Sequence, residues 1–114
     1  MKDCCTKNHE LIKQKLVNSQ EYMQNVEEVS KIFSLLGDAT RMKILLALME
    51  GELCVYHICE IVGGKQSAIS QHLRKLKDYK IVKSKKLANQ VLYSIADEHV
   101  SAIIRLGLEH KGCI

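Results

Sequence analysis

The chain has 114 residues, of which 46% are hydrophobic, with five Cys, no Pro and no Trp. This length predicts one globular domain with a limited core, and the apolar content excludes a disordered chain. No apolar run approaches the roughly 20 residues that span a bilayer, and the first ten residues lack the apolar core of a signal peptide. We therefore expect a cytoplasmic protein with no membrane partner, whose cysteines serve as thiols or metal ligands rather than disulfides.

The net charge of +4 is concentrated in the second half of the chain. Residues 1–60 carry seven Lys/Arg and nine Asp/Glu, a net charge of −2, whereas residues 61–114 carry ten and four, a net charge of +6. Eight of these basic residues lie within 65–86, where Asp78 is the only acidic one. Such a segment suits a polyanion such as nucleic acid, although a merely solvated surface has the same composition.

Apolar periodicity and turn residues predict the elements in chain order. Residues 22–36 carry an apolar stripe at helical spacing that Gly37 ends, and Asp38 can cap a largely buried helix that Gly51 ends. Next come a short helix over about 54–62, two glycines, and a helix over about 65–79. Strand-like segments, 81–86 and 91–95, flank a turn, and the last helix covers about 97–110.

The predicted helix at 65–79 has two distinct faces. Ile69, Leu73 and Leu76 can face a core, while polar side chains continue along the other side: Ser67, Ser70, Gln71, Arg74 and Asp78. Ser, Gln and Arg suit base edges and phosphates. The preceding short helix and glycine turn complete a helix-turn-helix pattern, beside which the basic hairpin would form a wing.

This pattern predicts binding to double-stranded DNA, although small helix-turn-helix units also occur as pure scaffolds. His72, within the same helix, is expected to be structural or close to DNA rather than a metal ligand. We predict DNA contacts from the polar helix face and the basic hairpin, through Lys65, Gln66, Ser67, Ser70, Gln71, Arg74, Lys83, Lys85 and Lys86.

The last helix carries candidate metal ligands at both ends. Asp97 and His99 lie at its start, and His110 and Cys113 lie at its end, about 20 Å away at roughly 1.5 Å per residue. One ion therefore cannot join both pairs within one molecule. Asp97 is also a natural helix N-cap, which alone would explain its presence. An apolar stripe between the pairs is suited to helix pairing: Val100, Ile103, Ile104, Gly107 and Leu108.

Four segments together resemble the ArsR/SmtB family of metal-responsive transcriptional repressors: "LGDATRMKILLAL", "ELCVYHI", "SAISQHLRKLKDYKIV" and "VLYSIADEHV". The resemblance covers about 26–113. It implies a mainly α fold with a small β-hairpin. The protein would be a homodimer with a winged helix-turn-helix fold. In this family the metal-free dimer binds its operator, and metal binding weakens that grip and derepresses efflux or detoxification genes. The sequence departs from the family at Ala39, often Pro, and in the wing turn 87–90, which lacks the usual Gly and Arg.

The resemblance also implies how the ends of the last helix are used. In family dimers these helices pair antiparallel, so that Asp97 and His99 of one subunit would meet the partner's His110 and the partner's Cys113. These four donors, one oxygen, two nitrogens and one sulfur, suit tetrahedral Zn(II) or a related ion. We therefore expect a divalent metal, Zn or Cd, at two equivalent inter-subunit sites.

A second metal site is implied by relatives in which a thiolate site joins the short helix of one subunit to the N-terminal extension of the partner. The spacing of Cys5 and His9 matches the extension pair, and that of Cys54 and His57 matches the helix pair, with Cys4 as a substitute. Residues 1–18 would then be a metal-ligand arm, and residues 19–114 the winged helix-turn-helix domain for DNA binding and dimerisation. His57 stands where relatives have Asp, and burial of the thiols in the core is the alternative explanation.

Two other functions stay open at this point. A repressor of the same fold could respond to arsenite or thiol oxidation through Cys4, Cys5 and Cys54. A protein of a different class could carry metal on its thiols without binding DNA, although the polar helix face argues against this. No nucleophile–base pattern beyond scattered Cys and His indicates an enzyme.

Overall fold

The computed structural model describes residues 6–112 of the chain. Internal contacts divide the chain into two compact units, one ending at Ser34 and the other beginning at Leu35. No helix in the described range is both long enough and apolar enough to cross a membrane. The second unit carries the predicted helix-turn-helix and hairpin.

The first unit consists of α1 (Thr6–Leu16) and most of α2 (Gln20–Leu36). Helix α1 was not predicted from the sequence, because its mainly polar composition hides the helical pattern. The predicted boundary after residue 18 falls in the turn between these helices, where the Ser19 hydroxyl accepts the backbone N–H of Tyr22 at 3.1 Å. The apolar stripe of α2 is largely exposed, through Tyr22, Met23, Val26, Val29 and Phe33.

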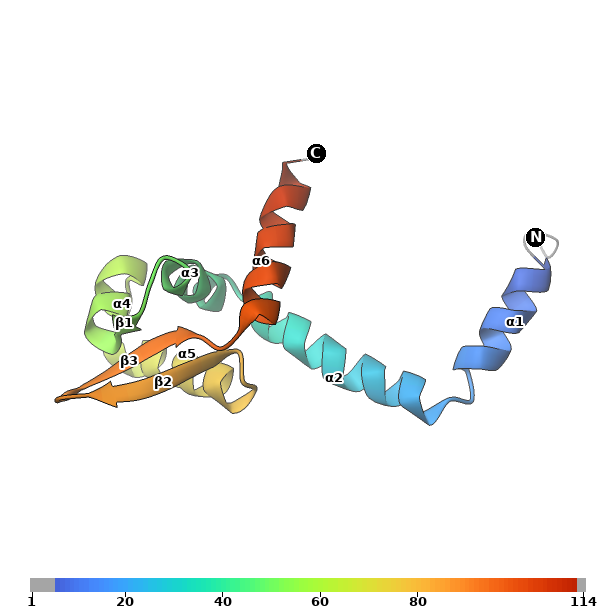
Figure 1. The fold of residues 1–114 in the computed structure, drawn as a ribbon, viewed down its shortest axis with the longest axis horizontal. Helices are drawn as coiled ribbons and strands as arrows, with labels where there is room; N and C mark the ends of the chain where they lie inside the picture. Colours follow the sequence, from blue (N-terminus) through green and yellow to red (C-terminus); the bar gives the residue numbers. More distant parts are fainter. Residues whose placement is uncertain (1–5, 113–114) are drawn as a thin grey trace. The chain divides into compact units, whose positions relative to one another are not determined.

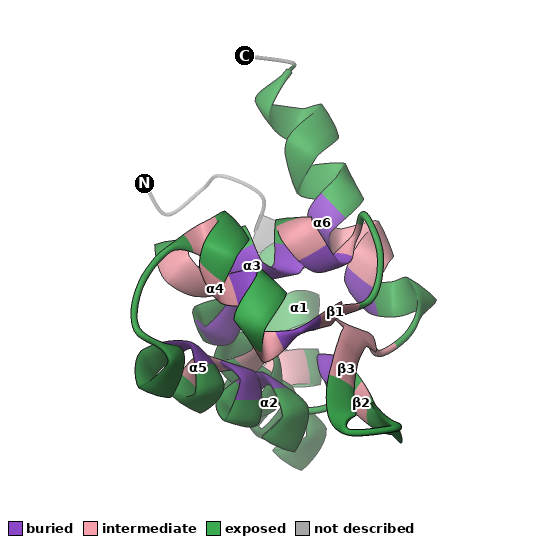
Figure 2. Cartoon of the chain, turned by 90° about the vertical axis from the view of Figure 1, so that its left-hand side faces the viewer, coloured by how far each residue is buried: buried purple, intermediate pink, exposed green. Residues whose placement is uncertain are grey.

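The second unit contains four helices and a small antiparallel sheet around one core (Figure 1). Its helices are α3 (Ala39–Leu48), α4 (Val55–Val62), α5 (Gln66–Asp78) and α6 (Glu98–Lys111). Purple segments in Figure 2 mark the inner faces of α3, α4 and α5. Seven side chains are almost completely buried there: Ile44, Leu45, Ile58, Ile69, Leu73, Leu76 and Val82. The apolar face predicted for α5 is therefore confirmed.

Asp38 begins α3 as its N-cap, as predicted. Its carboxylate accepts the backbone N–H of Arg41 at 3.0 Å, while its own backbone stays extended at φ −79° and ψ 132°. This hydrogen bond lowers the pKa of Asp38 below its ordinary value. Desolvation opposes it with a smaller effect, and the charge of Arg41 contributes a further, still smaller lowering. This cap fixes the residue at which α3 begins.

The sheet has three strands in the order β1-β3-β2, all antiparallel. The predicted hairpin is present as β2 (Val82–Leu87) and β3 (Gln90–Ile95), paired from Val82 with Ile95 to Leu87 with Gln90. A third strand, β1 (Leu53–Cys54), pairs its Cys54 with Leu92. The predicted hairpin is therefore confirmed, and β1 adds a third strand that was not predicted, because a two-residue strand leaves no alternating pattern in the sequence.

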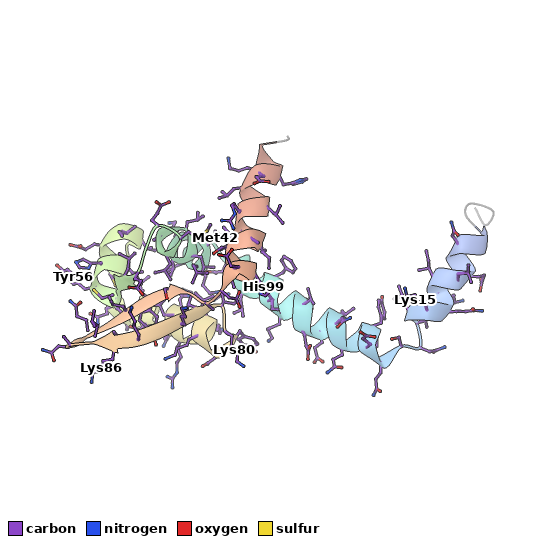
Figure 3. The ribbon with its side chains drawn as sticks, in the orientation of Figure 1. Lys15, Met42, Tyr56, Lys80, Lys86 and His99 are labelled. Atoms are coloured by element: carbon purple, nitrogen blue, oxygen red, sulfur yellow. The ribbon has the colours of Figure 1, made fainter. Side chains whose placement is uncertain are left out.

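The chain turns from α5 into the hairpin through a Schellman motif. The Ile81 N–H donates to the Leu76 carbonyl and the Lys80 N–H donates to the Lys77 carbonyl, both at 2.9 Å. Lys80, labelled in Figure 3, takes a left-handed conformation with φ 60°. Buried Ile81 and Leu76 supply the apolar contact typical of this motif. The recognition-helix candidate and the wing are thus joined by a fixed corner.

The final helix, α6, packs on its own subunit only through its first half. Val100 and Ile104 are buried, and Ile103 is half-buried. Beyond Ile104 every described residue of α6 is exposed, including Leu106 and Leu108, and Figure 2 shows this half projecting from the remainder of the second unit. The predicted apolar stripe is therefore divided between a part facing the core and a part without a covering surface among the described residues.

Candidate nucleic-acid interface and metal-ligand positions

The segment from α4 to α5 has the geometry that a helix-turn-helix requires. Gly63 and Gly64 connect the helices with φ values of 88° and 102°, which side chains other than glycine rarely adopt. Ile58 on α4 and Ile69 on α5 are both buried at this junction. The two helices are therefore held as one unit, and the outer face of α5 stays open.

The outer face of α5 carries the predicted DNA-contacting side chains. Every member of the predicted set is exposed, on α5 and its N-cap and on the hairpin: Lys65, Gln66, Ser67, Ser70, Gln71, Arg74, Lys83, Lys85 and Lys86. Helix α5 is also roughly as wide as the major groove of B-DNA. The exposed row of Ser, Gln and Arg can therefore reach base edges, while contact with DNA itself stays a prediction.

The hairpin presents its three lysines in two directions. Lys83 and Lys85 share one face of β2, and Lys86 lies on the other, because side chains alternate along a strand. Figure 3 shows Lys86 close to the hairpin tip. Lys85 also forms an ion pair of 3.2 Å with Glu52, just before β1. Binding of Lys85 to a phosphate would have to compete with this exposed pair, which is worth about 0.2–1 kcal/mol.

One contact between α3 and α5 was not predicted from the sequence. The Arg41 guanidinium donates through Nε to the Leu35 carbonyl at 2.9 Å, and its Nη1 lies 3.3 Å from Nδ1 of His72. Because Arg41 can only donate, His72 accepts through an unprotonated Nδ1 in this arrangement. The two residues are 31 positions apart, so no local pattern could reveal the contact. His72 thus has a structural contact, which is one of the two roles expected of it.

The predicted ligands at the start of α6 are exposed and close together. Asp97 is the N-cap, and its Oδ1 accepts the N–H groups of His99 and Val100 at 3.0 and 3.3 Å. The His99 Nδ1 lies 3.5 Å from the same oxygen, and the His99 side chain is 92% exposed (Figure 3). The carboxylate therefore keeps Oδ2 and the imidazole keeps Nε2 for a metal ion, so these two residues fit a divalent cation such as Zn.

The other end of α6 carries exposed His110, whereas Cys113 lies outside the described residues. Within 6–112 no group of three or more Cys, His, Asp or Glu side chains is gathered closely enough to hold a metal. A complete site on α6 would therefore need donors from both ends of the helix, which one molecule cannot bring together.

The second predicted ligand set is represented by the pair Cys54 and His57. The buried Cys54 Sγ lies 3.3 Å from Nδ1 of the exposed His57, against which the Tyr56 ring packs edge-on at a centroid distance of 5.4 Å. Cys54 was predicted to begin the short helix, but it is the N-cap that precedes α4. His9 is exposed in the first unit, 4.0 Å from Glu10, and Cys4 and Cys5 lie outside the described residues.

Comparison with known proteins places this geometry in a family. The family model "Bacterial regulatory protein, arsR family" matches residues 38–84, from the cap of α3 into β2. The chain is 40% identical over 89 residues to the "Cadmium resistance transcriptional regulatory protein CadC homolog" of Staphylococcus aureus, which covers 77% of this chain and 74% of that protein.

Solved structures agree with this assignment. The crystal structure of NolR from Sinorhizobium fredii is similar with a TM-score of 0.77 and 31% identity, covering 82% of this chain and 94% of that one. A homodimeric winged helix-turn-helix DNA-binding domain from Mycobacterium bovis has the same fold, with a TM-score of 0.77, 24% identity and coverage of 83% and 88%. The relatives are transcriptional regulators rather than enzymes, and this chain belongs to the ArsR/SmtB family of transcriptional regulators.

Proposed function

We propose that the chain is a metal-responsive repressor whose metal-free homodimer binds operator DNA and whose grip is weakened by a divalent ion such as Zn or Cd. The observation that carries this proposal is the pair of ligand clusters at opposite ends of α6. Asp97 and His99 are exposed at one end and His110 is exposed at the other. Support also comes from the cadmium-resistance regulator that the chain resembles.

The homodimer supplies the geometry that a single molecule lacks. Two copies of α6 that pair antiparallel would bring the start of one helix beside the end of the other. Asp97 and His99 would then share an ion with the partner's His110 and the partner's Cys113. This set supplies O, N and S donors in the number that tetrahedral Zn(II) takes.

Metal would act on DNA binding by selecting one arrangement of the two subunits. The α5 helices are spaced for two grooves in one arrangement and fit them less well in the other. A ligand shifts such an equilibrium only through its different affinity for the two states. A coupling of about 1–3 kcal/mol changes DNA affinity by about 5–150-fold.

The Cys54–His57 pair favours a second candidate, a repressor of the same fold that responds through a thiolate-rich site. The two donor atoms lie 3.3 Å apart. Thiolate ligands favour soft ions such as Cd(II). In this alternative Cys54 and His57 of one subunit hold the ion with the partner's Cys5 and the partner's His9, and the α6 positions serve only dimerisation.

The test is the operator affinity with and without saturating Zn(II), using an operator selected from a random-sequence duplex library by the metal-free protein. His110→Ala should bind this operator as tightly as the wild type but lose most of the response to Zn(II), because one ligand is missing from each bridging site. Lys111→Ala, an exposed neighbour, is the matched control and should respond normally. Equal release of the wild type and His110→Ala by metal would move the sensor to the Cys54–His57 pair.

A further inference from the structure

An open hollow lies between the start of α3 and one flank of α5. It is lined by Arg41 from α3 and, on α5, by Gln71, His72, Arg74, Lys75 and Asp78. We call it the α3–α5 hollow. Three of these side chains are formal cations and one is an anion, so the hollow is positive even with His72 neutral. A concave, cationic and solvent-open surface has the chemistry of an anion site.

Arg41 is held ready for a ligand in this hollow. Its Nε and Nη1 are already placed by the Leu35 carbonyl and by His72, which fixes the plane of the half-buried guanidinium. Among the described residues, the side-chain contacts of Arg41 are made by Nε and Nη1, which leaves Nη2 for a ligand. A guanidinium whose orientation is fixed before binding loses little entropy when it meets a phosphate oxygen.

The position of the hollow favours a phosphate of the DNA backbone as its ligand. Gln71 and Arg74 line the hollow and also belong to the exposed row of α5 that is predicted to reach base edges. A helix about 10–12 Å wide fills a major groove about 12 Å wide, so its flanks face the phosphates that border the groove. A phosphate seated beside Arg74 is therefore a neighbour of the bases that Gln71 and Arg74 would read.

We propose that the α3–α5 hollow binds a backbone phosphate at the edge of the major groove, contacted by Arg41 and Lys75. This inference rests on the proposed DNA-binding function and adds two residues outside the predicted contact set. Their role is to fix the register of α5 in the groove, since phosphate contacts position a protein without reading sequence. Asp78, at the same hollow, opposes the phosphate and would limit nonspecific binding.

The experiment uses the full chain and a random-sequence duplex of about 30 base pairs, because a phosphate contact does not depend on sequence. Affinity is measured by fluorescence anisotropy from about 50 to 200 mM salt. Lys75→Gln should reduce the slope of log affinity against log salt by about one for each subunit bound. Between about 50 and 200 mM salt, each lost contact should make the total fall in affinity about threefold smaller. Lys77→Gln is the matched control: it removes the same charge from the same exposed helix end, outside the hollow, and should keep the wild-type slope.

Two further variants keep the test independent of folding. Arg41→Lys retains the charge but loses the fork, and should weaken duplex binding while thermal unfolding confirms a folded chain. Asp78→Asn should strengthen binding to the same duplex. A wild-type salt slope in Lys75→Gln would overturn the phosphate assignment. The free protein is also tested with inorganic phosphate: if Lys75→Gln abolishes phosphate binding but leaves the salt slope for the duplex unchanged, the hollow binds an anion other than a DNA phosphate.

Failure of the inference and failure of the function have different signatures. If the wild type binds no duplex at all, the DNA-binding proposal fails and the hollow loses its ligand with it. If the wild type binds and Arg74→Ala weakens that binding, but Lys75→Gln and Lys77→Gln behave alike, only the hollow is wrongly assigned.

Discussion

At the scale of single residues, the Asp38 cap links folding to pH. Its pKa is lowered in the folded chain, mainly by the Arg41 backbone N–H, so its ionised form stabilises the fold. That contribution is complete above the pKa of the unfolded chain and disappears as the pH falls through the folded pKa. Acidification through the carboxyl range should therefore destabilise the second unit.

Urea unfolding at a series of pH values measures this effect. Asp38→Asn keeps an acceptor for the Arg41 N–H but no longer titrates, so its stability should fall less over the same range. Asp38→Ala loses the acceptor and should be less stable than the wild type at neutral pH. If Asp38→Asn and the wild type lose stability in parallel, the cap does not contribute to the acid sensitivity.

At the scale of elements, the corner at Lys80 holds a non-glycine residue in the left-handed conformation, as does Ala88 in the hairpin turn. A side chain at φ 60° costs roughly 1–2 kcal/mol relative to an ordinary conformation, and glycine avoids this cost. Lys80→Gly should stabilise the chain by about 1 kcal/mol, measured by chemical denaturation, since the Schellman hydrogen bonds stay in place. Lys80→Ala removes the same charge and side chain but keeps the strain, so it should show little of this gain; equal gains would mean that the strain at φ 60° contributes nothing.

The elements also show what could be predicted from the sequence. Helix α5 was predicted correctly because its apolar and polar residues alternate at helical spacing, and Gly63-Gly64 mark its start. Strand β1 has two residues and α1 has few apolar ones, so neither has a period to detect. The Arg41–His72 bond and the Lys85–Glu52 pair join residues far apart in the chain, and only the folded arrangement reveals them.

At the scale of the whole molecule, α6 is incomplete in a single subunit. Leu108 lies on the predicted pairing stripe and is 42% exposed, whereas Leu106 is 62% exposed on another side of the helix. Leu108→Asp should raise the dimer dissociation constant by about 100-fold, because each buried Leu contributes about 1.5–3 kcal/mol and symmetry counts it twice. Sedimentation equilibrium measures this constant.

Leu106→Asp is the matched control, since it places the same charge on the same helix outside the stripe. It should leave the dissociation constant close to the wild-type value. Equal weakening by both variants would mean that the pairing is not set by the stripe, and no change in either would place the dimer contact away from this end of α6.

The Schellman corner has a consequence for how a metal signal would reach DNA. The corner joins α5 to the wing, and the Ala96 N–H donates to the Ile81 carbonyl at 3.0 Å. We therefore expect α5 and the wing of each subunit to move together as one DNA-binding unit. An inducer could then alter only the distance and the angle between the α5–wing units of the two subunits. Half-sites of dimeric helix-turn-helix proteins lie about 34–36 Å apart, one turn of the duplex. The metal-bound dimer would thus keep its affinity for a single half-site but would prefer operators with a different spacing between their two half-sites.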